Sequence, residues 1–114
     1  MHELAVTESV LDIALRHAVQ AEAKRVIDIY LVIGTLSSIV DESVQFYWSI
    51  IAQDTLCQDA SLHFQRVPAR IRCQNCQTEY EIKDALSPCI QCQSFHLQVI
   101  GGEEFYVESI AIEK

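Results

Sequence analysis

Four cysteines in the second half of the chain have the spacing of a metal site. Cys73 and Cys76 form one Cys-x-x-Cys pair, and Cys89 and Cys92 form a second pair after twelve intervening residues. Four thiolates suit Zn²⁺, whereas magnesium, calcium and manganese prefer oxygen ligands. Iron in a rubredoxin-like site is an alternative that this spacing leaves open. Because four protein ligands leave no position for a substrate, we expect a site that stabilises the fold and performs no catalysis.

The composition is that of an acidic globular protein. The chain has 114 residues, half of them hydrophobic, and a formal net charge of −8. This charge disfavours nucleic acid and anionic membranes, and it suits a protein that handles cations. The chain begins without a signal segment and contains no apolar run of 18 residues. We therefore expect a cytoplasmic protein, with reduced cysteines rather than two disulfides.

Two segments have the apolar spacing of amphipathic helices. The first is predicted from about residue 6 to about residue 22, and the second from Asp41 to between Gln53 and Thr55. Each segment carries apolar residues at positions i, i+3, i+4 and i+7. These stripes are Leu11, Ala14, Leu15 and Ala18 in the first, and Val44, Tyr47, Trp48 and Ile51 in the second.

Three segments have the composition of β-strands. They are residues 25–33, 61–67 and 104–112. Both faces of residues 25–33 are largely apolar, so we expect a central strand there. An independently stable sheet needs three strands, so the last segment should join the first two. The sequence thus predicts an α+β fold, with two helices on a three-stranded sheet and a four-cysteine zinc ribbon inserted over about residues 71–95.

His2 is a further candidate metal ligand. The α-amino group of Met1, the amide nitrogen of residue 2 and the imidazole of His2 can reach one ion together, with Glu3 beside them. Nitrogen ligands in a plane suit Ni²⁺ or Cu²⁺. Methionine aminopeptidases prefer a small second residue, so Met1 should be retained. The alternative is an ordinary surface histidine.

Other residues offer weaker signals. His96 follows the second cysteine pair and is either a ligand of a nearby second site or a solvated residue. Cys57 has the properties of a small apolar residue or an inert thiol. Arg66, Arg70 and Arg72 form a basic cluster too small for a nucleic-acid surface, so we expect them either in salt bridges or at the rim of a surface that binds an acidic protein. The sequence contains no phosphate-binding loop and no recognisable nucleophile–base pair.

Landmarks along the whole chain resemble the HypA/HybF family of hydrogenase maturation proteins. They are Met1-His2-Glu3, Ile33-Gly34-Thr35-Leu36-Ser37, Arg66-Val67-Pro68-Ala69-Arg70, the two Cys-x-x-Cys pairs (called knuckles below) and Ser109-Ile110-Ala111-Ile112-Glu113. The resemblance implies a nickel metallochaperone, not an enzyme, with His2 and Glu3 at the nickel site. It implies structural zinc on Cys73, Cys76, Cys89 and Cys92.

The same resemblance implies partner proteins and separate domains for nickel and zinc. The partners are a hydrogenase-maturation GTPase and the precursor of the hydrogenase large subunit. We expect residues 1–69 and 97–114 to form the nickel-binding domain, and residues 70–96 to form the zinc-ribbon domain. Self-association stays open.

This chain departs from the family at three positions. The family usually has an acidic residue where this chain has Thr35. Glycine commonly follows the second cysteine of each pair, where this chain has Gln77 and Gln93. Because glycine relieves strain at positive φ, these glutamines predict less regular knuckle turns.

Two other functions compete with nickel carriage. A zinc-ribbon module for protein interaction or nucleic-acid binding is the first, and its nucleic-acid form would need a basic face that the net charge of −8 disfavours. An electron carrier with iron on the four thiolates is the second, and colour of the purified protein would distinguish it.

Overall fold

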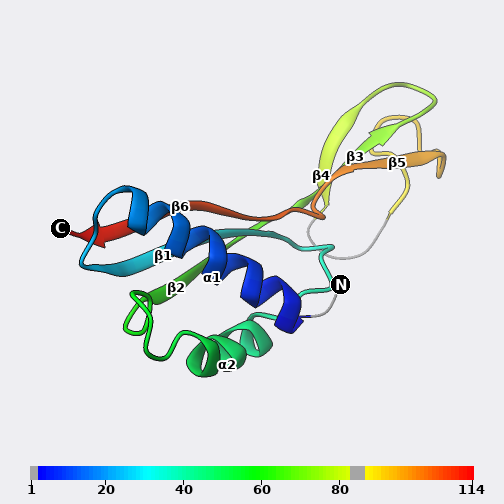
Figure 1. Cartoon of the computed structure of the whole chain (residues 1–114). Helices are drawn as coiled ribbons and strands as arrows, with labels where there is room; N and C mark the ends of the chain where they lie inside the picture. Colours follow the sequence, from blue (N-terminus) through cyan, green and yellow to red (C-terminus); the bar gives the residue numbers. More distant parts are fainter. Residues whose placement is uncertain (1–2, 83–86) are drawn as a thin grey trace. The chain divides into compact units, whose positions relative to one another are not determined.

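The computed structural model describes residues 3–82 and 87–114, which form two helices and two small sheets (Figure 1). The helices are α1 (Glu3–Gln20) and α2 (Asp41–Ile51). The strands are β1 (Arg25–Gly34), β2 (Ser61–Val67), β3 (Ala69–Cys73), β4 (Glu79–Ile82), β5 (Leu97–Gly101) and β6 (Phe105–Glu113). One sheet has the order β2-β1-β6 and the other β4-β3-β5. The α+β prediction is confirmed, and β1 is central as expected.

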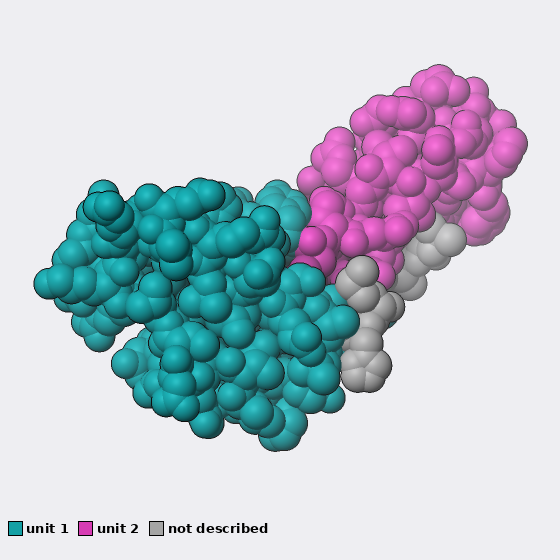
Figure 2. Space-filling view, in the orientation of Figure 1, with its two compact units in different colours: residues 1–32, 38–65, 106–114 teal, residues 33–37, 66–105 magenta. Residues whose placement is uncertain are grey.

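The chain divides into two compact units (Figure 2). The first unit comprises Met1–Val32, Ser38–Gln65 and Tyr106–Lys114, and the second comprises Ile33–Ser37 and Arg66–Phe105. We call the second the ribbon unit. The expected domains, residues 1–69 with 97–114 for nickel and residues 70–96 for zinc, were defined by the metal that each binds. Their assignment therefore stays a prediction.

The core of the first unit joins the helices to β1. On α1 the buried side is formed by Val6, Thr7, Val10, Ala14 and Ala18, at the spacing of one helix face. Val44 and Trp48 of α2 and Ile29 and Leu31 of β1 are buried as well. Burial of each large aliphatic side chain stabilises a fold by about 1.5–3 kcal/mol, so this unit has an ordinary hydrophobic core.

Three of the four predicted helix limits were wrong by two to four residues, whereas the predicted start of α2 at Asp41 is confirmed. Helix α1 begins at Glu3 rather than near residue 6, and the buried Thr7 hydroxyl donates to the Glu3 carbonyl over 2.6 Å. It ends at Gln20 because Glu22 has a φ of 57°, and the Ala23 amide donates back to the Ala18 carbonyl over 2.9 Å. A left-handed residue after the last turn is a common helix stop.

The ribbon unit contains three short strands that the sequence analysis did not anticipate. β3 pairs antiparallel with β4 and β5, and the ion pairs Arg72–Glu79 (2.9 Å) and Arg70–Glu81 (3.4 Å) cross from β3 to β4. The expected salt bridges of Arg70 and Arg72 are thereby confirmed. These pairs are solvent-exposed, so screening by water leaves each of them with little effect on stability.

Two glycines allow the segments at the base of the ribbon unit to meet. The Gly34 amide donates to the Glu104 carbonyl and the Leu36 amide to the Gly102 carbonyl, each over 2.7 Å. A Cβ on Gly34 would collide with the Gly102 carbonyl, and a Cβ on Gly102 would lie 2.6 Å from Ala69 Cα. Gly102 also has a φ of +106°, which side chains disfavour. Both positions therefore require glycine.

Candidate metal centre

Each cysteine pair lies on a tight turn held by its own backbone. In the first turn the Gln77 amide donates to the Cys73 carbonyl over 2.9 Å, and the Cys73 amide donates to the Thr78 carbonyl over 2.9 Å. The second turn repeats both bonds, from Gln93 to Cys89 over 2.8 Å and from Cys89 to Ser94 over 2.9 Å.

The two turns are regular, contrary to the expectation from their glutamines. Gln77 has a φ of 65° and Gln93 a φ of 60°, so both occupy the left-handed position that glycine favours. The repeated hydrogen bonds hold the glutamines in this conformation. The cost of placing a non-glycine residue there is of the order of 1 kcal/mol per turn.

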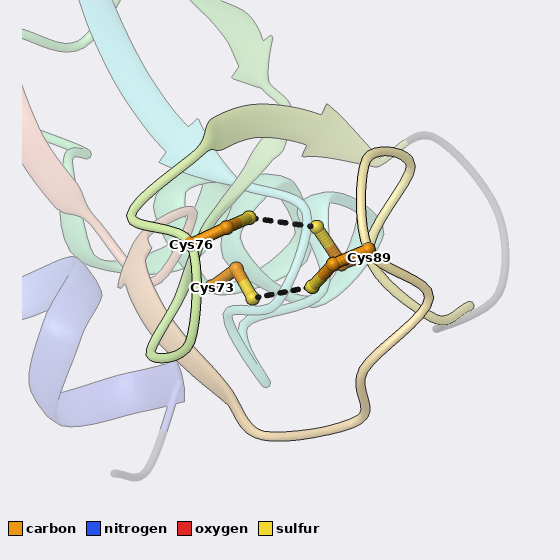
Figure 3. Close-up of side chains that lie close together, drawn as sticks. Cys73, Cys76 and Cys89 are labelled. Atoms are coloured by element: carbon orange, nitrogen blue, oxygen red, sulfur yellow. Dashed lines mark hydrogen bonds between the residues drawn. The ribbon is translucent and has the colours of Figure 1, made fainter.

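The turns bring the four sulfur atoms together. Figure 3 shows Cys73 and Cys76 from one turn facing Cys89 from the other. All four sulfurs lie within 4.8 Å of one another, with 3.6 Å from Cys73 to Cys92 and 3.5 Å from Cys76 to Cys89. Four sulfurs about 2.3 Å from one tetrahedral ion would be about 3.8 Å apart. A disulfide would require about 2.05 Å, so the arrangement fits a shared metal.

Hydrogen bonds favour the thiolate form at two of these cysteines. The hydroxyl and the amide of Thr78 lower the pKa of Cys76 to about 6. The amides of Cys92 and Gln91 lower the pKa of Cys89. Donors aimed at sulfur are therefore in place before any cation binds, which favours metal coordination at neutral pH.

At Cys92 the neighbouring sulfur atoms raise the pKa of the thiol instead of lowering it. The Ser94 amide favours its thiolate, but hydrogen bonding with Cys73, burial and the other two cysteines together raise the pKa of Cys92 to about 12. Burial and then the charges of the four cysteines also raise the pKa of Tyr80. Four thiolates in so small a space concentrate negative charge, so a divalent cation fits the donor set.

His96 lies outside this group. Among the residues that the structure describes, the cluster of nearby ligand atoms contains the four cysteines alone. His96 is exposed, and its amide donates to the Ser94 hydroxyl over 3.0 Å. Of the two alternatives for His96, the solvated residue is the one that agrees with this position.

The predicted nickel ligands lie at the start of the chain. Glu3 is the first residue of α1 and is partly exposed, while His2 lies outside the described residues. The assignment of His2 and Glu3 to nickel stays a prediction.

The structure also forms a polar cluster that the sequence analysis missed. His63 Nε2 lies 2.7 Å from Asp28 Oδ1, and its ring stacks on Tyr30 with 4.8 Å between centroids. The strands that carry these residues were predicted, but the register between β1 and β2, which brings the side chains together, was not readable from sequence. Cys57 is fully buried, and burial raises the pKa of its thiol to about 11.

The whole chain matches one protein family. The model for the family described as "Hydrogenase/urease nickel incorporation, metallochaperone, hypA" aligns with residues 1–112. This chain belongs to the HypA family. Curated relatives named hydrogenase maturation factor HypA include one from Dehalococcoides mccartyi strain BAV1, 39% identical over 99% of this chain and 95% of the relative. Another, from Geobacter sulfurreducens, is 34% identical over 99% of this chain and the whole relative.

Solved HypA structures share the fold. The nickel metallochaperone HypA of Helicobacter pylori is 22% identical and has a TM-score of 0.67, covering 99% of this chain and 98% of its own. A second HypA solution structure is 20% identical with a TM-score of 0.76, covering 98% and 96%. In the described part of this HypA chain, no helix is long and apolar enough to span a membrane.

Proposed function

We propose that this protein is a nickel carrier that binds Ni²⁺ through its N-terminus and delivers it during maturation of [NiFe]-hydrogenase. The match to the HypA family over residues 1–112 carries the proposal. His2 at the second position supports it, because a free N-terminus followed by histidine presents three nitrogen atoms to one ion. In this role the protein acts in the cytoplasm and is not an enzyme.

The start of α1 suits a bound cation in one respect. The N-terminus of a helix carries partial positive charge, which repels a cation. Glu3 lies in the first turn of α1, where its carboxylate offsets that charge. We therefore assign His2 as the principal nickel ligand and Glu3 as its acidic neighbour.

We assign structural Zn²⁺ to Cys73, Cys76, Cys89 and Cys92. The sulfur geometry described above supports four-coordinate binding, and the chemistry of four thiolates suits zinc. The ion would fold the two turns against each other. We further propose that nickel binding belongs to residues 1–69 and 97–114, and zinc binding to residues 70–96; the compact ribbon unit of the structure is wider and includes Arg66–Phe105.

The proposed partners are a hydrogenase-maturation GTPase and the precursor of the hydrogenase large subunit. A carrier must meet its acceptor near the nickel site, so the α1 side should take part. Affinity purification from cells that are producing hydrogenase should recover both. Recovery of neither would count against delivery to hydrogenase, while leaving nickel binding to be tested separately.

Calorimetric titration of Ni²⁺ into zinc-loaded protein tests the N-terminal site. Untagged protein should bind, whereas protein extended ahead of Met1 and the His2→Ala variant should each bind at least tenfold more weakly. The extension removes the amine and His2→Ala removes the imidazole. Because the end of a chain rarely carries fold stability, zinc content and helix content should not change.

His17→Ala is the matched control, because it removes an exposed histidine at the other end of α1. It should bind nickel as the unaltered protein does. Nickel binding should also weaken as the pH falls, since protons compete for the amine and the imidazole. Undiminished binding by both the extended protein and His2→Ala would refute the N-terminal site.

A further inference from the structure

The two outer strands of the ribbon sheet differ in how they protect their edges. β4 has the sequence Glu79-Tyr80-Glu81-Ile82, and its two glutamates discourage pairing with another strand. β5, orange in Figure 1, has the sequence Leu-Gln-Val-Ile-Gly without a charge or a proline. In the sheet order β4-β3-β5, β5 pairs on one side only among the described residues. Its other edge is open and chemically unprotected.

The register identifies the backbone groups at that open edge. The Gln74 amide donates to the His96 carbonyl over 2.8 Å, and Gln98 lies opposite Arg72. Because bonded pairs alternate along an antiparallel ladder, His96 and Gln98 face β3, and Leu97 and Val99 turn their groups outward. The Leu97 amide is taken by the Phe95 carbonyl over 2.9 Å. This leaves the Leu97 carbonyl and both backbone groups of Val99 for another strand.

The side chains around this edge have the composition of an interface. Phe95 is 71% exposed and Val99 is 44% exposed. Residues 87–102 contain no Asp, Glu, Lys or Arg, although charged residues make up 21% of the chain. Exposed aromatic and aliphatic side chains in a surface depleted of charge are typical of the centre of a protein–protein interface.

A pocket of about 530 Å³ lies at the end of the same strand. It is lined by Val99, Ile100, Gly101, Glu103 and Glu104. The Gly102 amide donates to the Glu104 carboxylate, and backbone amides lower the pKa of Glu104, so this side chain is ionised at neutral pH. The described residues of the lining thus combine an apolar wall with carboxylates, and none of them is cationic.

We propose that the open edge of β5 binds an extended segment of another protein as an added strand, with an arginine or lysine side chain of that segment entering the Glu103–Glu104 pocket. Backbone hydrogen bonds to Leu97 and Val99 supply affinity, and the pocket selects the basic side chain. A bulge between β3 and β5 at Ile71 and Arg70 ends the regular edge at Val99, beside the pocket. The site goes beyond nickel carriage and does not depend on it.

Charge distinguishes this occupant from a second copy of the chain. Residues 87–104 contain no lysine or arginine, so a second β5 would bring no cation to the pocket. Two chains of net charge −8 would also repel each other. A basic segment of a different protein satisfies both the strand edge and the carboxylates.

The test is an NMR titration of ¹⁵N-labelled, zinc-loaded, full-length protein with a capped pentapeptide. The peptide alternates threonine and valine around a central arginine, and a second peptide carries glutamate at the centre. Saturable shifts should concentrate at the amides of residues 97–101, 103 and 104. The arginine peptide should bind at least fivefold more tightly than the glutamate peptide.

Two variants separate the strand edge from the pocket. Val99→Pro removes the outward amide without removing a bond to β3, and it should abolish binding. Glu103→Gln should weaken binding of the arginine peptide at least threefold, whereas Glu108→Gln, the same charge change on β6, should not. Zinc content and the spectrum of the free variant report whether Val99→Pro has folded, and Glu103→Gln tests the pocket independently.

Three results would overturn the proposal. Shifts that are absent or spread over the surface would exclude a site at β5. Equal binding of both peptides would exclude the carboxylate pocket. Concentration-dependent shifts of residues 97–101 without peptide, with a dimer in sedimentation, would assign the edge to self-association instead.

Discussion

The first unit and the ribbon unit are stabilised by different means. The first unit buries large side chains from both helices and from β1, including Trp48, Ile29 and Leu31. In the ribbon unit, the buried apolar residues among those described are Ile33, Ala69, Ile71, Cys73 and Cys89. Two of these five are proposed metal ligands. A unit this small cannot rely on hydrophobic burial alone, so we expect a metal ion on the four cysteines to take the place of a larger core.

Removing the metal should produce the largest effect and the sharpest contrast between the units. Structural zinc contributes about 10–16 kcal/mol of apparent binding free energy in zinc-finger peptides, and that energy is folding energy. Chelation or Cys73→Ser should therefore abolish hydrogen-exchange protection in β3 and β5 while the first unit keeps its protection. Cys57→Ala, which removes a thiol away from the centre, should retain zinc. Melting of the entire chain in one step on chelation would break the comparison.

Core truncation should affect the first unit and spare the ribbon. Val10→Ala removes two methyl groups from a side chain that is 3% exposed, and should lower the free energy of unfolding by about 2–3 kcal/mol. Val19→Ala makes the same change on the same helix at 66% exposure, and should have an effect within about 0.5 kcal/mol. Denaturant unfolding followed by Trp48 fluorescence measures both. Equal effects would mean that α1 does not bury the face described here.

The thiol of Cys57 gives the first unit a dependence on alkaline pH. The pKa of this buried thiol rises from 9.0 to about 11 on folding, so the folded chain keeps a proton that the unfolded chain loses. Its contribution to stability is complete below pH 9 and is lost as the pH rises to about 11. Unfolding measured from pH 8 to pH 11 should show a steeper loss for this protein than for Cys57→Ala. Parallel curves would contradict the buried position.

Replacing a glutamine that follows a cysteine pair should give the smallest change in stability, and this change should be an increase. Gln77→Gly relieves a left-handed residue and should stabilise the zinc-bound ribbon by about 1 kcal/mol. Competition with a chromophoric chelator should then show roughly fivefold tighter zinc binding, as that energy implies. Gln74→Gly, in the same turn but not among the residues with positive φ, is the control and should not tighten binding. A loss of affinity in Gln77→Gly would show that its side chain, bonded to the Gln74 carbonyl, matters more than its backbone.

Periodicity and spacing predicted much of this molecule, for identifiable reasons. The stripe containing Ala14 and Ala18 located α1, because close packing makes a long amphipathic pattern hard to mistake. Two Cys-x-x-Cys pairs predicted the sulfur cluster, because short loops limit where the four side chains can lie. The start of α1 and the ends of both helices were missed. For α1, the bond from the Thr7 hydroxyl to the Glu3 carbonyl and the left-handed conformation of Glu22 are local features that composition does not reveal.

The strands of the ribbon were missed for a different reason. β3 alternates buried Ala69, Ile71 and Cys73 with arginines, but it is five residues long and follows directly after Pro68. Strands this short carry too few alternations to distinguish them from a loop. Their pairing depends on register, which single-sequence patterns do not encode.

The contact between Gly34 and Gly102 limits how this protein can diverge. A side chain at Gly34 would meet backbone atoms of Gly102 and Glu103, which no substitution elsewhere can shrink. A second mutation elsewhere, which often compensates for an unfavourable substitution, thus cannot relieve the clash at this position. Selection should remove variants at Gly34 even when every cysteine is intact, while the side chain of Leu36, 46% exposed, drifts freely two residues away.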